Sequence, residues 1–153
     1  AAPMRSSESA SSVDMSTERF RLAVVQAGTR LWVEDLGDAV LAREQVDLIA
    51  AIAAALAHPE ELSARPRIAQ FDWPLHGNHQ LDLGAGEAAA SLTSFLNRQL
   101  DERGCIELMC LGDAATKRLR GLAVSCARRD LLSTRELLVE PLRKRELWAA
   151  LRA

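Results

Sequence analysis

A short apolar run near the middle of the chain limits the possible folds more than any other stretch. It covers residues 105–111 and reads Cys-Ile-Glu-Leu-Met-Cys-Leu, which is typical of a strand that is buried on both faces. A helical pattern over 87–103 precedes it, and Gly104 is expected to end that helix in the left-handed conformation. After the run, Gly112 and Asp113 predict a tight turn in which Asp113 caps a new helix. Helix, buried strand, glycine turn and helix follow one another as in a parallel α/β sheet.

The rest of the chain alternates between strand and helix patterns in the same way. We predict further strands over 20–25, 67–71 and 122–126, and either a short strand or a loop at 32–35. Helices are expected over 41–57, 113–119 and 141–151, the last of them opened by Pro141, and Ser133 is expected to cap a turn over 135–138. This order predicts an α/β fold, a three-layer α/β/α sandwich around a central, mainly parallel sheet of about four strands.

The first 18 residues differ in composition from the rest of the chain. They contain six serines among small and polar residues, so they bury too little apolar surface to offset the entropy of ordering. We therefore expect a flexible linker over 1–18 and a single α/β domain over 19–153. The chain does not begin with Met, which favours a piece of a longer protein with further residues upstream.

Composition and charge restrict the class of protein. The hydrophobic content of 48% and the charged content of 26% are those of a soluble globular domain. Neither a membrane-length apolar stretch nor a signal peptide is present in the sequence, so we expect a cytoplasmic protein with no membrane partner. From residue 117 onward there are ten Lys or Arg against four Asp or Glu, whereas residues 1–116 hold nine against seventeen. A basic C-terminal part is typical of a surface that binds nucleic acid or an acidic partner. It is equally typical of helices whose charged faces are simply in contact with solvent.

The three cysteines and the known sequence motifs give no sign of a metal or a cofactor. Cys105, Cys110 and Cys126 lack the paired spacing of a zinc site, and we interpret them as small core residues in a reducing compartment. The glycine-rich phosphate loops, the zinc-protease motif and the serine-hydrolase elbow are absent from the sequence. We therefore predict no metal and no cofactor.

The richest group of polar and aromatic residues follows the predicted strand over 67–71. In parallel sheets, ligands bind at the carboxyl ends of the strands, and this stretch carries Asp72, Trp73, His76, Asn78 and His79. Two imidazoles, an amide and an indole suit the binding of a base or a phosphate, or the transfer of a proton. The alternative is structural, with Trp73 packed over the sheet and the polar side chains bonded to their own loop.

Three segments, taken in order, resemble the DNA polymerase III psi subunit family in its pseudomonad form. They are 71–74 (Phe-Asp-Trp-Pro) with the loop and helix that follow, the strand end 110–115, and the tail 132–148. The resemblance covers about residues 20–152 and lies in the order of the segments. It implies a non-enzymatic bridging subunit whose α/β domain forms a one-to-one complex with the chi subunit. The chi subunit would in turn contact the single-stranded-DNA-binding protein. In that family an N-terminal peptide contacts the clamp loader, and residues 1–18 do not resemble this peptide.

The same order of elements also resembles the uracil-DNA glycosylase fold. That chemistry needs a proline-containing loop with a polarising residue after the first strand, and a late histidine. Residues 25–29 read Val-Gln-Ala-Gly-Thr and residues 131–134 read Leu-Leu-Ser-Thr, so neither group is present at the matching positions. This second resemblance therefore implies the scaffold and not the reaction.

Three hypotheses about function follow. The first is a psi-like adaptor that binds its partner through tryptophans, with Trp32, Trp73 and Trp148 as candidates. The second is a diverged glycosylase-type enzyme in which Asp72, His76, Asn78 or His79 meet the loops at Gly28 and Ser133. The third is a single-stranded nucleic-acid binder, for which the candidates are Arg143, Lys144 and Arg145.

Overall fold

The computed structural model describes residues 19–57, 65–74 and 85–152. In these residues the chain forms an α/β protein with one open, mixed sheet of five strands and five α-helices. The strands are β1 (Phe20–Ala27), β2 (Arg30–Asp35), β3 (Arg67–Trp73), β4 (Glu107–Leu111) and β5 (Ala127–Leu131). The helices are α2 (Arg43–Leu56), α3 (Ala85–Arg103), α4 (Asp113–Leu119), α5 (Thr134–Val139) and α6 (Lys144–Arg152), with a 3-10 turn η2 (Pro141–Arg143).

The sheet order is β3-β1-β2-β4-β5, which differs from the predicted four-stranded, mainly parallel sheet. β1 is antiparallel to both of its neighbours, while the pairs β2–β4 and β4–β5 are parallel. The difference arises at Gly28, which has a φ of 63° and opens a two-residue turn that pairs Ala27 with Arg30. Such a turn folds the chain back as a hairpin, so 30–35 becomes a full strand.

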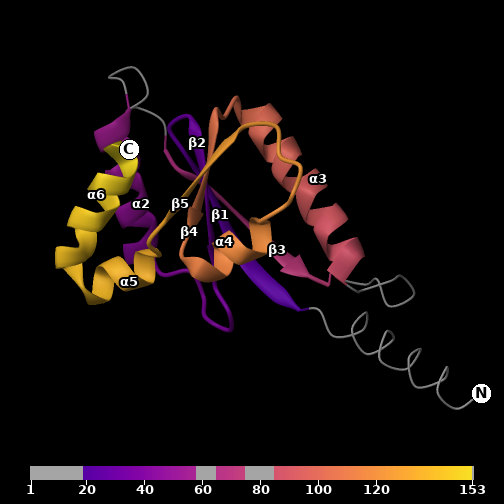
Figure 1. Cartoon of the computed structure of the whole chain (residues 1–153), viewed down its shortest axis with the longest axis horizontal. Helices are drawn as coiled ribbons and strands as arrows, with labels where there is room; N and C mark the ends of the chain where they lie inside the picture. Colours follow the sequence, from indigo (N-terminus) through magenta and orange to yellow (C-terminus); the bar gives the residue numbers. More distant parts are fainter. Residues whose placement is uncertain (1–18, 58–64, 75–84, 153) are drawn as a thin grey trace, which may run out of the picture.

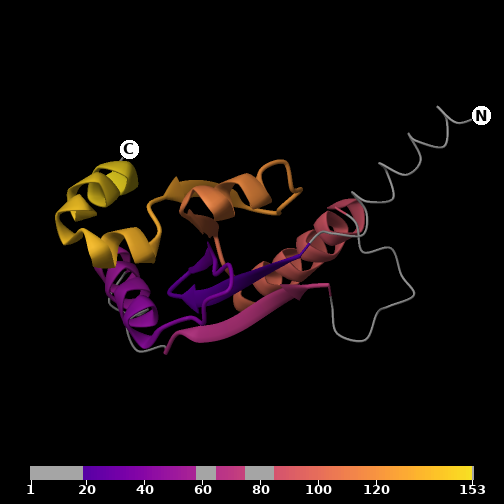
Figure 2. The ribbon, with the colours of Figure 1, turned by 90° about the horizontal axis from the view of Figure 1, so that it is seen from below.

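Helices cover both faces of the sheet. On one face, α3 and α4 pack against β1, β2, β3 and β4 in a core that includes Leu22, Leu92, Leu96 and Leu108. On the other face, α2, α5 and α6 pack around Trp32, with Ile49, Leu137 and Leu147. Figure 1 shows α2, α5 and α6 on one side of the sheet and α3 on the other, and Figure 2 shows the same separation at right angles.

The segment that limits the fold most in the sequence is a buried strand as predicted, but the strand begins at Glu107 and leaves Ile106 60% exposed. Gly104 ends α3 with a φ of 63°, and the amide of Cys105 donates to the carbonyl of Leu100 over 2.9 Å, as in a Schellman cap. β4 then lies between β2 and β5 with four of its five residues buried. The predicted cap is shifted by one residue, because Gly112 occupies the N-cap position and Asp113 is the first residue of α4.

The last strand lies five residues later than predicted. Residues 122–126, whose apolar side chains predict a strand, form a loop that Asn97 holds in place. Its side-chain amide donates to the carbonyl of Ala123 over 2.9 Å and accepts from the amide of Ser125 over 2.8 Å. Leu122, Val124 and Cys126 pack against the core on the α3 side from this loop. The strand itself, Ala127–Leu131, is an edge strand in which only Leu131 is fully buried, so it lacks the apolar pattern of a strand.

Candidate functional sites at the carboxyl edge and on the surface

Four strands end and one begins at the same edge of the sheet. Because β1 alone runs in the opposite direction, the carboxyl ends of β2, β3, β4 and β5 lie together with the start of β1. This carboxyl edge is where open α/β sheets bind their ligands. The Gly28 turn lies at the other edge, about 20 Å from Glu34 at a strand rise of 3.3 Å per residue. The sequence-based expectation that it joins the loops at the carboxyl edge was therefore wrong.

A buried polar cluster lies at the carboxyl end of β2. Glu34 is 3% exposed, and its Oε1 accepts from both the amide and the hydroxyl of Thr134, over 2.9 and 2.6 Å. The amide of Gln45 donates to Glu34 Oε2 over 3.1 Å and to the Thr134 hydroxyl over 2.9 Å. Gln45 Oε1 also accepts from the amide of Ala42 at the start of α2. The cluster thus joins β2, α2 and α5, and the sequence gives no sign of it.

The turn after β4 approaches the start of α5 closely. Gly112 has a φ of 88°, and its amide donates to the carbonyl of Leu131 over 2.7 Å. Ser133 caps α5 as predicted, because its hydroxyl accepts from the amide of Glu136 over 3.0 Å. In return, Glu136 accepts from the amide of Ser133 over 3.2 Å. That backbone hydrogen bond lowers the pKa of Glu136, with a smaller effect from Arg143.

Beside this turn lies a small cavity of about 170 Å³. Its acidic lining residues are Glu34, Asp35, Asp113 and Glu136. Glu34 and Glu136 are held by hydrogen bonds to Thr134 and Ser133. In the described ranges no three or more His, Cys, Asp or Glu side chains are grouped as metal ligands. Glu34 and Glu136 thus act in this cavity as hydrogen-bond acceptors for the first residues of α5.

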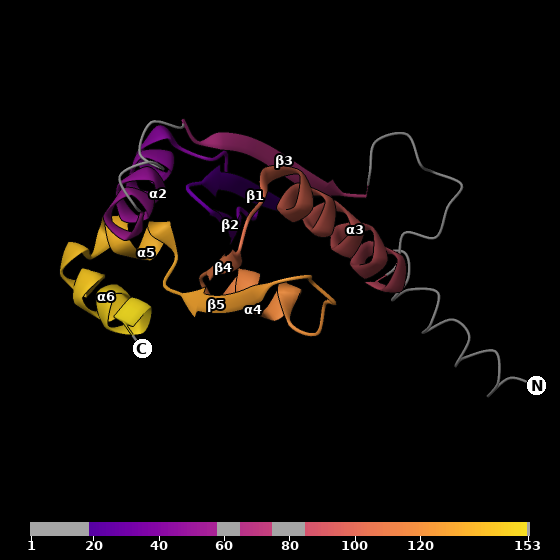
Figure 3. The ribbon, with the colours of Figure 1, turned by 90° about the horizontal axis from the view of Figure 1, so that it is seen from above.

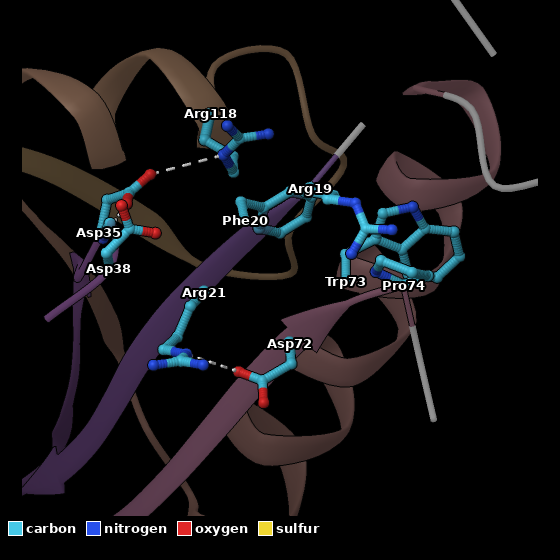
Figure 4. Close-up of a pocket in the computed structure, with 10 residues that line it drawn as sticks. Arg19, Phe20, Arg21, Asp35, Asp38, Asp72, Trp73, Pro74 and Arg118 are labelled. Atoms are coloured by element: carbon cyan, nitrogen blue, oxygen red, sulfur yellow. Dashed lines mark hydrogen bonds and ion pairs between the residues drawn. The ribbon is translucent and has the colours of Figure 1, made fainter. Parts of the chain in front are cut away.

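A larger cavity of about 470 Å³ opens at the start of β1 and the end of β3. Figure 4 shows two ion pairs in it, Arg118 with Asp35 and Arg21 with Asp72, on either side of Phe20. The atoms Arg118 Nε and Asp35 Oδ2 lie 3.6 Å apart, and the Arg118 guanidinium lies 3.9 Å from the centre of the Phe20 ring. Four of the charged residues in this cavity are thus opposed in two pairs, and Arg19 and Asp38 line it as well.

The three predicted partner-binding tryptophans lie in different environments. Trp32 is fully buried, and its indole donates to the carbonyl of Ala27 over 3.3 Å. Trp73 is 5% exposed and stacks on Phe71, with ring centres 6.4 Å apart. Trp148 is half-buried and packs against the core on the α2 side. Only Trp148 therefore presents part of its ring at the surface.

The three predicted nucleic-acid contacts are only partly available. Arg143 is paired with acidic side chains, since its Nε lies 2.8 Å from Glu146 Oε2 and its Nη1 lies 3.1 Å from Glu136 Oε2. The pKa of Arg143 is raised, above all by its hydrogen bond to Glu146. Lys144 and Arg145 are exposed. Of the three basic residues, Lys144 and Arg145 are thus exposed, whereas Arg143 is paired with acidic residues of the same chain.

The residues predicted for the alternative enzyme are only partly described. Asp72 lies at the carboxyl edge, half-exposed and 3.5 Å from Arg21. His76, Asn78 and His79 fall outside the described residues. Ser133 is at the same edge as Asp72, but the Gly28 turn is at the opposite edge, so the sheet does not bring Asp72 and the two predicted loops into one pocket.

Two groups of large apolar side chains are exposed to solvent and were not predicted. We name the first the α5–η2 corner, formed by Leu138, Val139 and Leu142, which are 42%, 76% and 81% exposed. The second lies between α2 and β3, where Val40 is 79% and Ile68 57% exposed. The consecutive apolar residues at 137–139 are the one sequence signal for the corner, because a short amphipathic helix cannot bury all of them.

No helix in the part of the chain that is described has the length and apolar content that a membrane span requires. Comparison with family models, curated proteins and solved structures gave no match.

Proposed function

We propose that this chain is a psi-like adaptor subunit of the DNA polymerase III clamp-loader complex. In this role it acts without catalysis and holds the chi subunit in a one-to-one complex. It bridges chi to the clamp loader, and chi in turn contacts the single-stranded-DNA-binding protein. The observation that carries the proposal is the exposed apolar α5–η2 corner.

The α5–η2 corner has the features of a protein-binding surface. Below it, Leu137 and Leu147 are fully buried and fix α5 and α6 to the core. The corner is therefore exposed on a fixed support and is not a frayed end. Burying one Leu or Val side chain in an interface contributes about 2 kcal/mol, so the corner offers several kcal/mol to a partner.

Its surroundings are polar, as at the rim of an interface. The Arg143 side chain joins Glu136 of α5 to Glu146 of α6, while Lys144 and Arg145 remain exposed beside them. Arg143 therefore stabilises the corner, and the exposed pair favours a partner with acidic residues around its contact. The resemblance to the psi family supports the same place, because its tail segment, 132–148, contains the whole corner.

The experiment is sedimentation of the chain with the chi subunit encoded in the same genome. We expect a one-to-one complex that weakens at least 10-fold when Val139→Ser and Leu142→Ser are combined. Ile106→Ser is the matched control, because Ile106 is 60% exposed but lies before β4, and this variant should bind as the parent chain does.

Two outcomes would contradict the proposal. One is a folded chain that forms no complex with chi at micromolar concentration. The other is a complex that the corner variant and the Ile106 variant weaken equally. The absence of a complex would favour the alternatives, a glycosylase-type enzyme or a nucleic-acid binder. Uracil-containing single strands test the first alternative, and salt-dependent binding that is lost on neutralising Arg143, Lys144 and Arg145 tests the second.

A further inference from the structure

The large apolar side chains that the described residues expose lie at three places on the surface. The first is the α5–η2 corner, and α5 begins directly after β5, at the carboxyl edge of the sheet. The second holds Val40 and Ile68, on the α2 side. The third is Ile106, whose amide donates to the carbonyl of Thr29 over 2.7 Å. Thr29 belongs to the Gly28 turn, so Ile106 lies at the opposite edge of the sheet from the start of α5.

The corner alone is smaller than the interface of a stable one-to-one complex. Such an interface covers about 800 Å² on each partner, or about 20–30 residues. The corner and its polar rim lie within residues 135–146, which are twelve residues, and Leu137 among them is fully buried. A partner that is stably bound at the corner therefore covers a neighbouring surface as well.

A groove of about 480 Å³ lies between α2 and β3, and we name it the α2–β3 groove. Its apolar lining includes the aliphatic side chains of Val40, Leu41, Val46 and Ile68. β3 is the outermost strand of the sheet, so no further strand of the described ranges covers the outer side of the groove. Val40 and Ile68 are therefore exposed in a hollow that other apolar side chains line.

The loop between β2 and α2, which carries Val40, connects this groove to the corner. α5 holds the loop at both of its ends. At one end, the Arg135 side chain donates to the carbonyl of Leu36 over 3.1 Å. At the other end, the Gln45 side chain in the first turn of α2 donates to the hydroxyl of Thr134 over 2.9 Å. Figure 3 shows α2 between α5 and β3, so the corner and the groove lie on either side of the start of α2.

We propose that the partner bound at the corner extends across the start of α2 and fills the α2–β3 groove, so that the two form one interface. This inference rests on the proposed function and identifies a second part of the surface that the chi subunit covers. Two arguments carry it: the area that a stable complex needs, and the continuity of the groove with the corner.

The lining of this surface determines the chemistry of the contact. Aliphatic side chains of the partner fill the groove, because Arg43 and Asp47, which are charged and line it, form an ion pair with each other. Between the groove and the corner, Arg135 is exposed. A guanidinium has five N–H groups, so Arg135 can donate to a carboxylate or a carbonyl of the partner while it bonds Leu36.

The test is sedimentation of the full chain with the chi subunit from the same genome. Val40→Ser and Ile68→Ser are combined as the groove variant, and we expect it to weaken the complex at least 10-fold. Ile106→Ser is the matched control, because it replaces an isoleucine of similar exposure outside the proposed surface, and it should bind as the parent chain does. Circular dichroism checks that each variant is folded, and all three substituted side chains are exposed.

Hydrogen exchange of the unmodified complex is a second measurement that needs no substitution. The amides of residues 36–43 and 66–70 should exchange more slowly in the complex than in the free chain. Those of residues 104–106 should exchange at the same rate in both.

Two results would overturn the inference and leave the proposed function in place. One is a chi complex that the corner variant weakens but the groove variant does not, with unchanged exchange over residues 36–43 and 66–70. The other is dimerisation of the chain alone that the groove variant abolishes, which would assign the groove to a second copy. A folded chain that forms no complex with chi would overturn the inference together with the proposed function.

Discussion

The hydroxyl of Thr134 donates a hydrogen bond of 2.6 Å to Glu34 Oε1, although 100 residues separate the two in the chain. Both side chains are almost completely buried. The amide of Thr134 donates to the same oxygen, so a single carboxylate fixes the first turn of α5 against β2.

We predict that Thr134→Val destabilises the protein by about 2 kcal/mol. The valine has the same shape but leaves Glu34 Oε1 and the Gln45 amide each without one partner, and an unsatisfied buried polar group costs about 1–3 kcal/mol. Urea unfolding followed by circular dichroism measures the change. Thr93→Val is the control, because the Thr93 hydroxyl bonds only the carbonyl of Ala89 in its own helix, and we expect less than about 0.5 kcal/mol there.

A double-mutant cycle tests whether the effect belongs to this pair. Glu34→Gln removes the charge with little change in shape, and its combination with Thr134→Val should show a coupling of about 1 kcal/mol or more. Additive effects of the two substitutions would show that the hydrogen bond contributes little, and that burial alone explains both changes.

Gly112→Ala should destabilise the protein by about 3 kcal/mol. A Cβ at position 112 would lie 2.8 Å from the Cβ of Ser133, and the φ of 88° is one that alanine rarely adopts. The left-handed backbone costs about 1–2 kcal/mol and the overlap adds about 1–3 kcal/mol. Gly104→Ala is the matched control, since its φ of 63° is also positive but nothing lies within 4 Å of the added atom. A loss of stability no larger than that of the Gly104 variant would show that the turn at Gly112 shifts to make room for the added Cβ.

The sequence correctly predicts those elements that depend only on residues close together in the chain. The apolar run of β4, the glycine that ends α3 and the Ser133 cap are each determined by neighbouring residues, and all three are confirmed. The α/β class follows from them. The direction of β1 was missed because it depends on one hairpin turn at Gly28, and β5 was misplaced because an edge strand needs few apolar residues.

The candidate sites were less predictable, for a different physical reason. Glu34, Gln45 and Thr134 come from three distant segments, and only the folded sheet brings them into contact. The β3 edge was predicted as a strand, but its lack of a second neighbour depends on the sheet order. The frequency of tryptophan at interfaces predicts partner contacts, yet large side chains also fill cores, as Trp32 does.

Acid should weaken the link between β4 and β5. The Glu107 carboxylate, 13% exposed, lies 2.9 Å from Arg30 Nε and 2.7 Å from Arg129 Nε. Burial raises the pKa of Glu107, but the hydrogen bonds from the two arginines outweigh burial and lower it from 4.5. A group with a lowered folded-state pKa stabilises the protein above its unfolded pKa and loses that effect as the pH falls through the folded value.

We therefore predict that Glu107→Gln costs about 2 kcal/mol at pH 7 and that the difference from the parent chain shrinks below about pH 4.5. Urea unfolding of both proteins between pH 7 and pH 3 measures the difference in their free energies of unfolding. The other carboxylates titrate in both proteins, so their contributions cancel in this difference. A difference that stays constant over this range would mean that Glu107 is not ion-paired in solution.

The three thiols should react slowly in the native protein. The pKa of Cys105 is raised to about 11 and that of Cys110 to about 12, with burial as the largest cause. Burial also raises the pKa of Cys126. Because the thiolate is the reactive form, a rise from 9.0 to about 11 lowers its amount at pH 8 about 100-fold. Alkylation at pH 8, with the labelled positions assigned by mass spectrometry, should modify Cys110 only as fast as the protein unfolds. In 6 M guanidinium all three should react at the rate of a free thiol, and native-state labelling of Cys110 at that rate would contradict its place in the core.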